Sequence, residues 1–224
     1  HELPDEHIGR VLDAARARIA DLRRDGRFRF VSFFKNCGRD AGASLAHPHS
    51  QIVALPVVPS ALADEFRGAR RHFLARGRCV FCDIAAQETD AGTRLAARSD
   101  LFAAFAPYAS RVPFELAVMP LRHAAGFEET TPAECAALGA LLGPLLRRVA
   151  AALADPPYGM VLHTAPNGRA AAGPDAADFF HWHLEILPLA VRPGAFDLGT
   201  GSSVNPTPPE EAAAFLRAAG EPER

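Results

Sequence analysis

The residues best suited to chemistry form the run HPHSQ at positions 47–51. Two histidines stand one residue apart, and a glutamine follows two positions after the second. Apolar and β-branched residues continue the run, so we expect a strand from His47 to about Val58. Side chains alternate between the faces of a strand, so His47, His49 and Gln51 would project from one face. Two imidazoles and an amide on one face indicate a site, whereas a pair of ordinary surface histidines is the simpler interpretation.

The same pattern occurs again at residues 179–187, with the sequence FFHWHLEIL. In both copies H-x-H is followed by a polar residue two positions later and then by isoleucine. A long helical pattern, a strand pattern and a loop beginning at an asparagine (Asn36 or Asn167) precede each copy in the same order. The chain is therefore expected to contain two homologous halves. The second half has an upstream C-x-x-C and a pair of strand patterns without counterparts in the first, so we expect the first half to be incomplete.

Helical and strand patterns alternate along the chain. Apolar residues recur at helical spacing over residues 5–24 and 61–76 and in a long helix after residue 131, which Thr131 is expected to cap. Strand patterns cover residues 28–35, 47–58, 101–106, 114–119, 158–164 and 179–187.

The composition is that of a globular protein with a sizeable core, because 49% of its 224 residues are hydrophobic and 22% are charged. A net charge of −2 gives no basic field, so no nucleic-acid partner is expected. The alanine-rich stretch 133–154 contains charged residues, so we expect no membrane-spanning segment. Four cysteines are too few for a disulfide scaffold, which favours a reducing, cytoplasmic location.

Cys79 and Cys82 have the spacing of a metal-binding C-x-x-C pair. Thiolates and imidazoles suit tetrahedral zinc, and His123 and His181 are the histidines expected to complete a closed structural site. Unrelated cysteines and histidines are the simpler alternative. A redox role is the weaker interpretation, since no βαβ pattern surrounds the pair.

In the first half, His47 corresponds to His181 and is therefore expected to bind a metal, which leaves His49 free to react. A neutral imidazole is a good nucleophile toward phosphorus when a hydrogen bond holds its other nitrogen. Gln51 could donate to phosphate oxygens, and the small residues from Gly42 to Ser44 allow a phosphate to approach the backbone. Glu185 replaces this glutamine in the second copy and would repel a phosphate there.

Three motifs together resemble the active-site signature of the galactose-1-phosphate uridylyltransferases, a family of the histidine-triad superfamily. They are FKNxG at 34–38, GAS at 42–44 and HPHSQ at 47–51, and FHWHLEILP at 180–188 resembles the family's C-terminal motif. The resemblance implies an α+β fold of two tandem histidine-triad-like halves, with antiparallel sheets flanked by helices. Residues 1–60 would be the C-terminal part of an incomplete first half, and residues 61–224 the second half.

The resemblance also implies a ping-pong nucleotidyl transfer in galactose metabolism. His49 would attack the α-phosphorus of UDP-glucose, glucose 1-phosphate would leave, and galactose 1-phosphate would accept the uridylyl group. Gln51, Ser44 and Gly42 would bind phosphate, and Asn36 would help to bind the nucleotide. The implied partners are a nucleotide sugar and a hexose 1-phosphate or phosphate, and the implied assembly is a homodimer.

The substrate and the second metal site have alternatives. The run GTG at 199–201 lacks the tyrosine–glutamate pair of the galactose enzymes and is closer to the ADP-glucose phosphorylase branch, so an ADP-glucose-type phosphorylase is the alternative activity. Better-known family members build their second metal site from a glutamate and three histidines, which would be Glu65, His163, His181 and His183 here. We favour the set with the two cysteines.

Two other classes of protein also have to be considered. A histidine-triad hydrolase has a third motif histidine where Gln51 stands, and glutamine cannot act as the general acid that assists attack by water. A non-catalytic zinc-binding domain is the other class, and the joint presence of His49, Gln51 and Ser44 argues against it.

Overall fold

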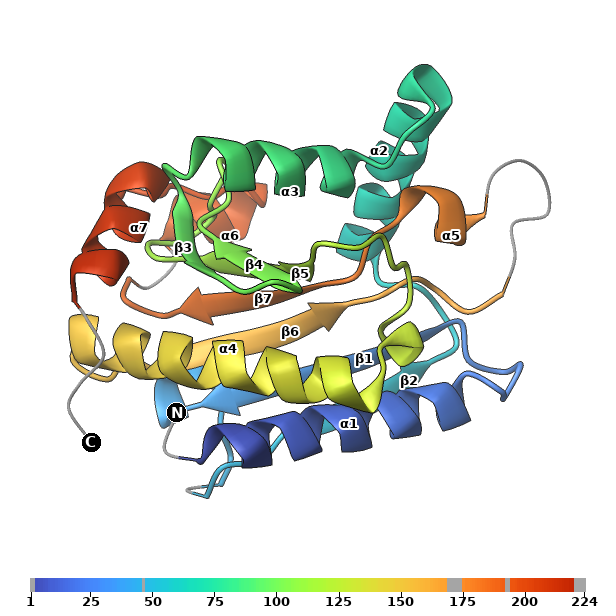
Figure 1. Ribbon diagram of the computed structural model, residues 1–224, viewed down its shortest axis with the longest axis horizontal. Helices are drawn as coiled ribbons and strands as arrows, with labels where there is room; N and C mark the ends of the chain where they lie inside the picture. Colours follow the sequence, from blue (N-terminus) through green and yellow to red (C-terminus); the bar gives the residue numbers. More distant parts are fainter. Residues whose placement is uncertain (1–2, 46, 169–174, 192–193, 220–224) are drawn as a thin grey trace.

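The computed structural model contains one seven-stranded antiparallel sheet with the order β2-β1-β6-β7-β5-β4-β3 (Figure 1). It describes residues 3–45, 47–168, 175–191 and 194–219. The strands are β1 (Phe30–Cys37), β2 (Gln51–Leu55), β3 (Leu95–Arg98), β4 (Phe102–Phe105), β5 (Leu116–Pro120), β6 (Tyr158–His163) and β7 (His183–Pro188). The helices are α1 (Asp5–Leu22), η1 (Arg39–Ala41), α2 (Ser60–Arg76), α3 (Val80–Ala91), η2 (Phe127–Glu129), α4 (Pro132–Ala152), α5 (Ala176–Phe179), α6 (Ala195–Thr200) and α7 (Pro209–Ala218). The expected α+β fold of antiparallel strands and flanking helices is confirmed, and strands from both expected halves join in one sheet.

The two halves are related by an approximate twofold axis, which passes between the central strands β1 and β6. They are antiparallel neighbours, with Phe34 opposite Val161. On their outer sides, Phe34 pairs with Gln51 and Val161 pairs with Glu185, so the strand that follows each H-x-H motif has the same register. Phe34 and Val161 are 127 positions apart, as are the first residues of α1 and α4. The internal repeat is therefore a structural repeat.

This register corrects one equivalence inferred from the loops. Asn36 lies two residues beyond Phe34, and His163 lies two residues beyond Val161, so Asn36 corresponds to His163 rather than to Asn167. Loops differ in length between repeats, whereas strand register is held by hydrogen bonds along the whole ladder.

Helices α1 and α4 cover one face of the sheet side by side (Figure 1). Their backbones come close at two glycines. A Cβ atom added to Gly139 would lie 2.5 Å from the backbone nitrogen of Gly9 and 2.7 Å from the carbonyl oxygen of Asp5. Thr131 caps α4 as expected, because its hydroxyl accepts a hydrogen bond from the backbone nitrogen of Glu134 and the glutamate side chain accepts one in return.

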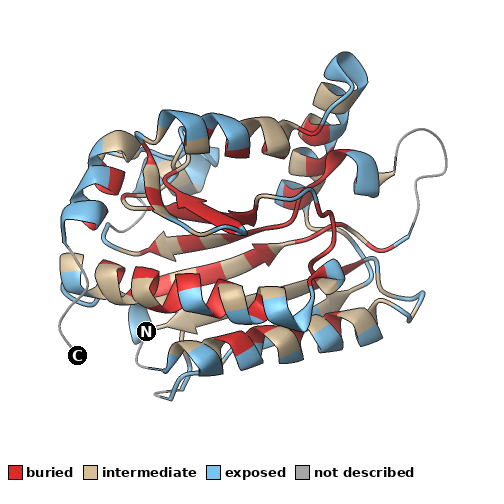
Figure 2. Cartoon of the chain, in the orientation of Figure 1, coloured by how far each residue is buried: buried red, intermediate tan, exposed pale blue. Residues whose placement is uncertain are grey.

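Helix α4 differs from expectation in one respect. Its 21 residues are long and apolar enough to cross a membrane by length and composition, although no such segment was expected. Half of its most apolar stretch is buried inside the protein, against α1 and the sheet. The burial pattern in Figure 2 is that of a core helix with one exposed stripe.

Helix α3 packs on the opposite face of the sheet. Residues alternate along β4, so that Phe102 joins the α4 side of the core while Phe105 joins Ala85 of α3. Cys79 is the residue before α3, and Cys82 lies in the first turn of this helix.

Both H-x-H motifs lie largely outside the strands predicted for them. Strand β2 begins at Gln51, so His47 and His49 belong to the segment that enters it. Strand β7 begins at His183, and the expected start of that strand is instead helix α5. Proline in the first motif cannot donate to a strand ladder, which is consistent with the later start of β2.

Candidate functional site

The two H-x-H motifs share one local hydrogen bond. Nδ1 of His49 lies 3.1 Å from the carbonyl oxygen of His47, and Nδ1 of His183 lies 3.1 Å from the carbonyl oxygen of His181. A carbonyl oxygen only accepts, so Nδ1 must carry the proton and donate it. In that tautomer Nε2 keeps its lone pair, which is the state that a nucleophilic or metal-binding histidine needs.

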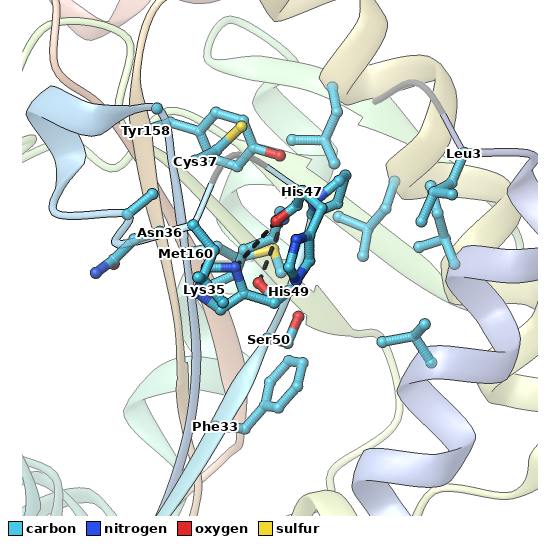
Figure 3. Close-up of a pocket in the computed structure, with 18 of the residues that line it drawn as sticks. Leu3, Phe33, Lys35, Asn36, Cys37, His47, His49, Ser50, Tyr158 and Met160 are labelled. Carbon is cyan, nitrogen blue, oxygen red and sulfur yellow. Dashed lines mark hydrogen bonds between the residues drawn. The ribbon is translucent and has the colours of Figure 1, made fainter.

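A cavity of about 340 Å³ opens beside the first motif, between the α1–α4 layer and strands β1 and β6 (Figure 3). His47, His49 and Ser50 lie at its polar end, and Asn36 also contributes to the lining. Its apolar wall contains Ile8, Val11, Leu12, Phe33, Leu142, Leu146 and Met160. The cavity therefore combines a few polar side chains with an apolar chamber, as ligand sites commonly do.

The other predicted residues of this site lie around the cavity at different distances. Asn36 donates from Nδ2 to the carbonyl oxygen of Gly42 at 3.5 Å, and Gly42 has the positive φ of 85° that glycine tolerates. Ser44 and Gln51 are exposed and do not line the cavity, and Gln51 pairs with Phe34 in the sheet. The structure thus brings Asn36 and the two histidines together, and the roles of Gln51 and Ser44 stay predictions.

Sequence reasoning gave no role to Lys35, which the structure places in the same cavity. Its Nζ donates to the carbonyl oxygen of His49 at 3.4 Å (Figure 3). A signal was present in the sequence, because Lys35 is the sole lysine among 24 lysines and arginines.

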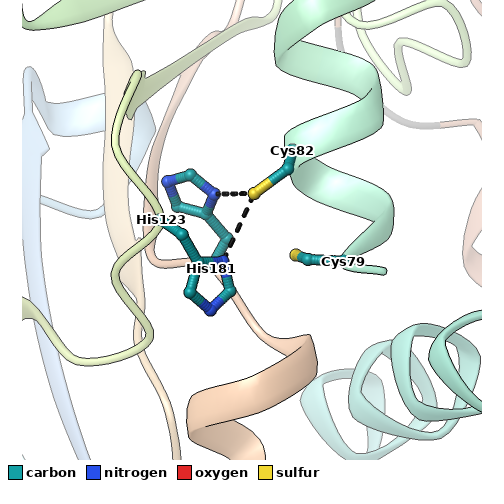
Figure 4. A group of neighbouring side chains, drawn as sticks. All are labelled: Cys79, Cys82, His123 and His181. Atoms are coloured by element: carbon teal, nitrogen blue, oxygen red, sulfur yellow. Dashed lines mark hydrogen bonds between the residues drawn. The ribbon is translucent and has the colours of Figure 1, made fainter. Parts of the chain in front are cut away.

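The second half brings Cys79, Cys82, His123 and His181 together (Figure 4). Their ligand atoms all lie within 4.8 Å of one another. Sγ of Cys82 is 3.3 Å from Nδ1 of His123 and 3.5 Å from Nδ1 of His181. Neighbouring ligands of tetrahedral zinc, with bonds of about 2.3 Å to sulfur and 2.0 Å to nitrogen, lie roughly 3.5 Å apart. The donor set and its spacing fit a zinc ion.

The surroundings of this cluster orient one of its histidines and favour a thiolate on one of its cysteines, as cation binding would require. Nε2 of His123 donates to the carbonyl oxygen of Ala177 at 2.8 Å, which directs Nδ1 toward Cys82. The hydrogen bond from the Cys82 thiol lowers the pKa of Cys79 well below that of a free thiol, so one thiolate is already favoured. His181 is fully buried.

Glu65, His163 and His183 form a separate group whose ligand atoms also lie within 4.8 Å of one another. Oε2 of Glu65 is 2.8 Å from Nδ1 of His163, and Oε1 is 3.3 Å from Nε2 of His183. The two predicted metal sets competed for His181, and the structure places His181 with the cysteines. Burial lowers the pKa of His183, while the hydrogen bond to Glu65 and the charge of Glu185 raise that of His163 against the effect of its own burial.

Arg111 forms ion pairs with two carboxylates beside this second group. Its Nη2 lies 2.5 Å from Oε2 of Glu185 and 2.7 Å from Oε1 of Glu115. Burial opposes the charge of Glu185, but His163 and Arg111 lower the pKa of that carboxyl overall. A carboxylate and its ion pairs therefore stand in the second half where the first half has a neutral glutamine.

Comparison with known proteins identifies the family. The family model described as "Domain of unknown function (DUF4931) N-terminal domain" matches residues 2–58. ADP-glucose phosphorylase from Arabidopsis thaliana is 33% identical over 94% of this chain and 58% of its own length. Galactose-1-phosphate uridylyltransferase from Thermotoga maritima is 28% identical over 96% of this chain and 68% of its own length. The chain thus spans little more than half of the plant relative.

A crystal structure of ADP-glucose phosphorylase from Arabidopsis thaliana with bound ADP-glucose superimposes with a TM-score of 0.88. The match has 32% identity and covers 96% of this chain and 68% of that chain. The chain belongs to the galactose-1-phosphate uridylyltransferase-like family, together with the plant ADP-glucose phosphorylase.

Proposed function

We propose that this chain belongs to a nucleotidyltransferase that acts on nucleoside diphosphate sugars, with His49 as the residue that carries the nucleotidyl group. The hydrogen bond from Nδ1 of His49 to the carbonyl oxygen of His47 carries the proposal, because in the neutral ring it leaves the lone pair on Nε2, and His49 lines the cavity. Relatives with this activity, and similarity over nearly the whole chain, support the assignment.

The reaction has two balanced steps. In the first, the lone pair on Nε2 of His49 attacks the α-phosphorus, a nitrogen–phosphorus bond forms, and the bond from phosphorus to the bridging oxygen breaks. The sugar 1-phosphate leaves with the electron pair of that bond. Nδ1 keeps its proton throughout, and the carbonyl oxygen of His47 stabilises the positive ring that results. In the second step, an oxygen of the acceptor phosphate attacks phosphorus and His49 leaves as a neutral imidazole.

The first donor and acceptor pair that we propose is UDP-glucose with galactose 1-phosphate, in galactose metabolism. ADP-glucose with inorganic phosphate is the second candidate. A specific observation favours it, since the plant ADP-glucose phosphorylase has 33% identity with this chain and the Thermotoga uridylyltransferase has 28%. We further propose a cytoplasmic homodimer in which both subunits complete each site.

We also propose that zinc binds Cys79, Cys82, His123 and His181. Four protein ligands would leave no open position, so the ion would be structural and would take no part in the reaction. It would tie the start of α3 to the segment that enters β7. His47 belongs to no group of three possible ligands among the residues described, so its metal-binding role stays a proposal.

The test is to incubate the zinc-loaded protein that carries this sequence with UDP-glucose or with ADP-glucose and then measure its intact mass. We expect a nucleotidyl adduct with at least one donor, and no adduct in His49→Ala. His7→Ala is the matched control, because His7 is an exposed histidine of α1 outside the cavity. Release of free nucleoside monophosphate in place of transfer would indicate a hydrolase. Absence of an adduct with both donors would refute the proposal.

A further inference from the structure

Lys35 is the one basic residue of the cavity wall that is not a histidine, and it is the sole lysine in the sequence. It lies on β1 opposite Met160. The side chain is partly buried, and its neighbours on the same face of the strand are Phe33 and Cys37. An ammonium group in such apolar surroundings needs compensating partners, because burying a charge without them is costly.

The protein supplies Lys35 with little compensation. An ammonium group has three donors, and the described contact is one long hydrogen bond of 3.4 Å to the carbonyl oxygen of His49. Lys35 makes no ion pair with any residue that the structure describes, whereas the more deeply buried Arg94 pairs with Glu88 at 2.7 Å. Asp155 is the carboxylate of the cavity wall, but no ion pair joins it to Lys35 among the described residues, so the counter-charge for Lys35 would come from a ligand in the cavity, next to His49.

The second half gives an independent comparison. The 127-residue offset makes Leu162 the counterpart of Lys35, and Leu162 is a buried core residue. The same half has Glu185 where the first half has Gln51. Both differences remove features that favour an anion, and both occur in the half whose H-x-H histidines contact a carboxylate and the cysteine cluster.

We propose that Lys35 is a phosphate-binding residue: its ammonium group contacts the phosphate of the nucleotide that His49 attacks, and it holds the His49 backbone at the same time. The ligand class is a nucleoside diphosphate or its sugar ester. This inference rests on the proposed function and adds the group that neutralises the phosphate during the attack. Lysine suits this task as a compact charge on a flexible stem.

The first experiment compares single-turnover nucleotidylation of His49 in the unaltered protein, Lys35→Met and Lys35→Arg. Methionine keeps the length and removes the charge, so we expect the rate at low nucleotide-sugar concentration to fall about 10- to 100-fold, the usual effect of losing a charged hydrogen bond. Arginine should restore part of the rate. Arg10→Met, which removes an exposed cation on α1, should leave the rate unchanged. Equal rates in Lys35→Met and the unaltered protein would overturn the proposal.

The second experiment uses the sole lysine as a probe and does not depend on activity or on a variant that folds. Reductive methylation with ¹³C-formaldehyde keeps the charge and labels Lys35 and the terminal amine. Adding UDP or ADP should shift the Lys35 signal, while uridine or adenosine, which have no phosphate, should not. If the Lys35 signal does not shift with either diphosphate, the proposal is overturned even when the adduct forms. A shift without any adduct would show that phosphate binding is right and the proposed transfer is wrong.

Discussion

Gly139→Ala should destabilise the protein, because the backbone of α1 lies where the new methyl group would go. The added carbon would be 2.5 Å from the nitrogen of Gly9 and 2.8 Å from its Cα. Comfortable carbon contacts are about 3.5–4.0 Å, so α1 and α4 would have to separate by roughly 1 Å. Overpacking of this kind costs about 1–3 kcal/mol, and the helix preference of alanine returns up to about 1 kcal/mol. We expect a net loss of about 1–2 kcal/mol.

Scanning calorimetry or urea unfolding measures this loss, which corresponds to a fall in Tm of roughly 2–8 °C for a chain of this size. Gly68→Ala is the matched control, because Gly68 is also inside a helix but an added Cβ would have no neighbour within 4 Å. That change should raise stability by about 0.5–1 kcal/mol. If Gly139→Ala melts at or above the unaltered protein, α1 and α4 do not touch at this point and the reasoning fails.

Three other changes test the metal cluster and two ion pairs. Cys82→Ala should abolish zinc binding, measured by mass spectrometry of the metal after dialysis, while Cys135→Ala, which removes a buried thiol elsewhere, should retain it; equal zinc contents would contradict the cluster. Glu134→Gln should cost about 1–2 kcal/mol at pH 7, because the hydrogen bond from Arg122 lowers the pKa of the folded glutamate to about 2. A lowered pKa stabilises above the unfolded value near 4.5, so the cost should vanish as the pH falls from about 4.5 to 2, and a constant cost would be the contrary result. Glu88→Gln removes the buried one of the two carboxylates that pair with Arg94 and leaves Glu210, so it should cost about 1.5–3 kcal/mol in urea unfolding, against almost nothing if the pair were solvated.

Much of the fold could be predicted from local patterns. Apolar periodicity located α1, α2 and α4, and the residues Thr131 and Pro132 marked the start of α4 correctly. Helix α3 is not among the predicted helices, because its first turn contains the C-x-x-C pair, whose spacing indicates metal ligands rather than a helix. The adjacency of β1 and β6 was also missed, since periodicity reports which face of a strand is buried but not which strand lies beside it.

The candidate site also has a part that the sequence predicts and a part that only the structure reveals. Ligand types and spacing were enough to predict the cluster of Cys79, Cys82, His123 and His181, which the structure brings together. The sequence alone is compatible with His181 in either metal set. The structure was needed to assign His181 to the cluster with the cysteines rather than to the group with Glu65. Lys35 belongs to the FKNxG motif at residues 34–38, but a strand pattern does not show that its side chain enters the cavity beside His49.

The near-twofold relation between the halves has a consequence for the history of the chain. An ancestral duplication would have left two equal copies of the helix, strand and H-x-H unit, of which one was free to change. Lys35 and Leu162 occupy one pair of equivalent positions, and Gln51 and Glu185 occupy another. Each half therefore serves as a homologue of the other, and a single chain contains a comparison of the copy proposed to react with the copy proposed to bind a structural metal.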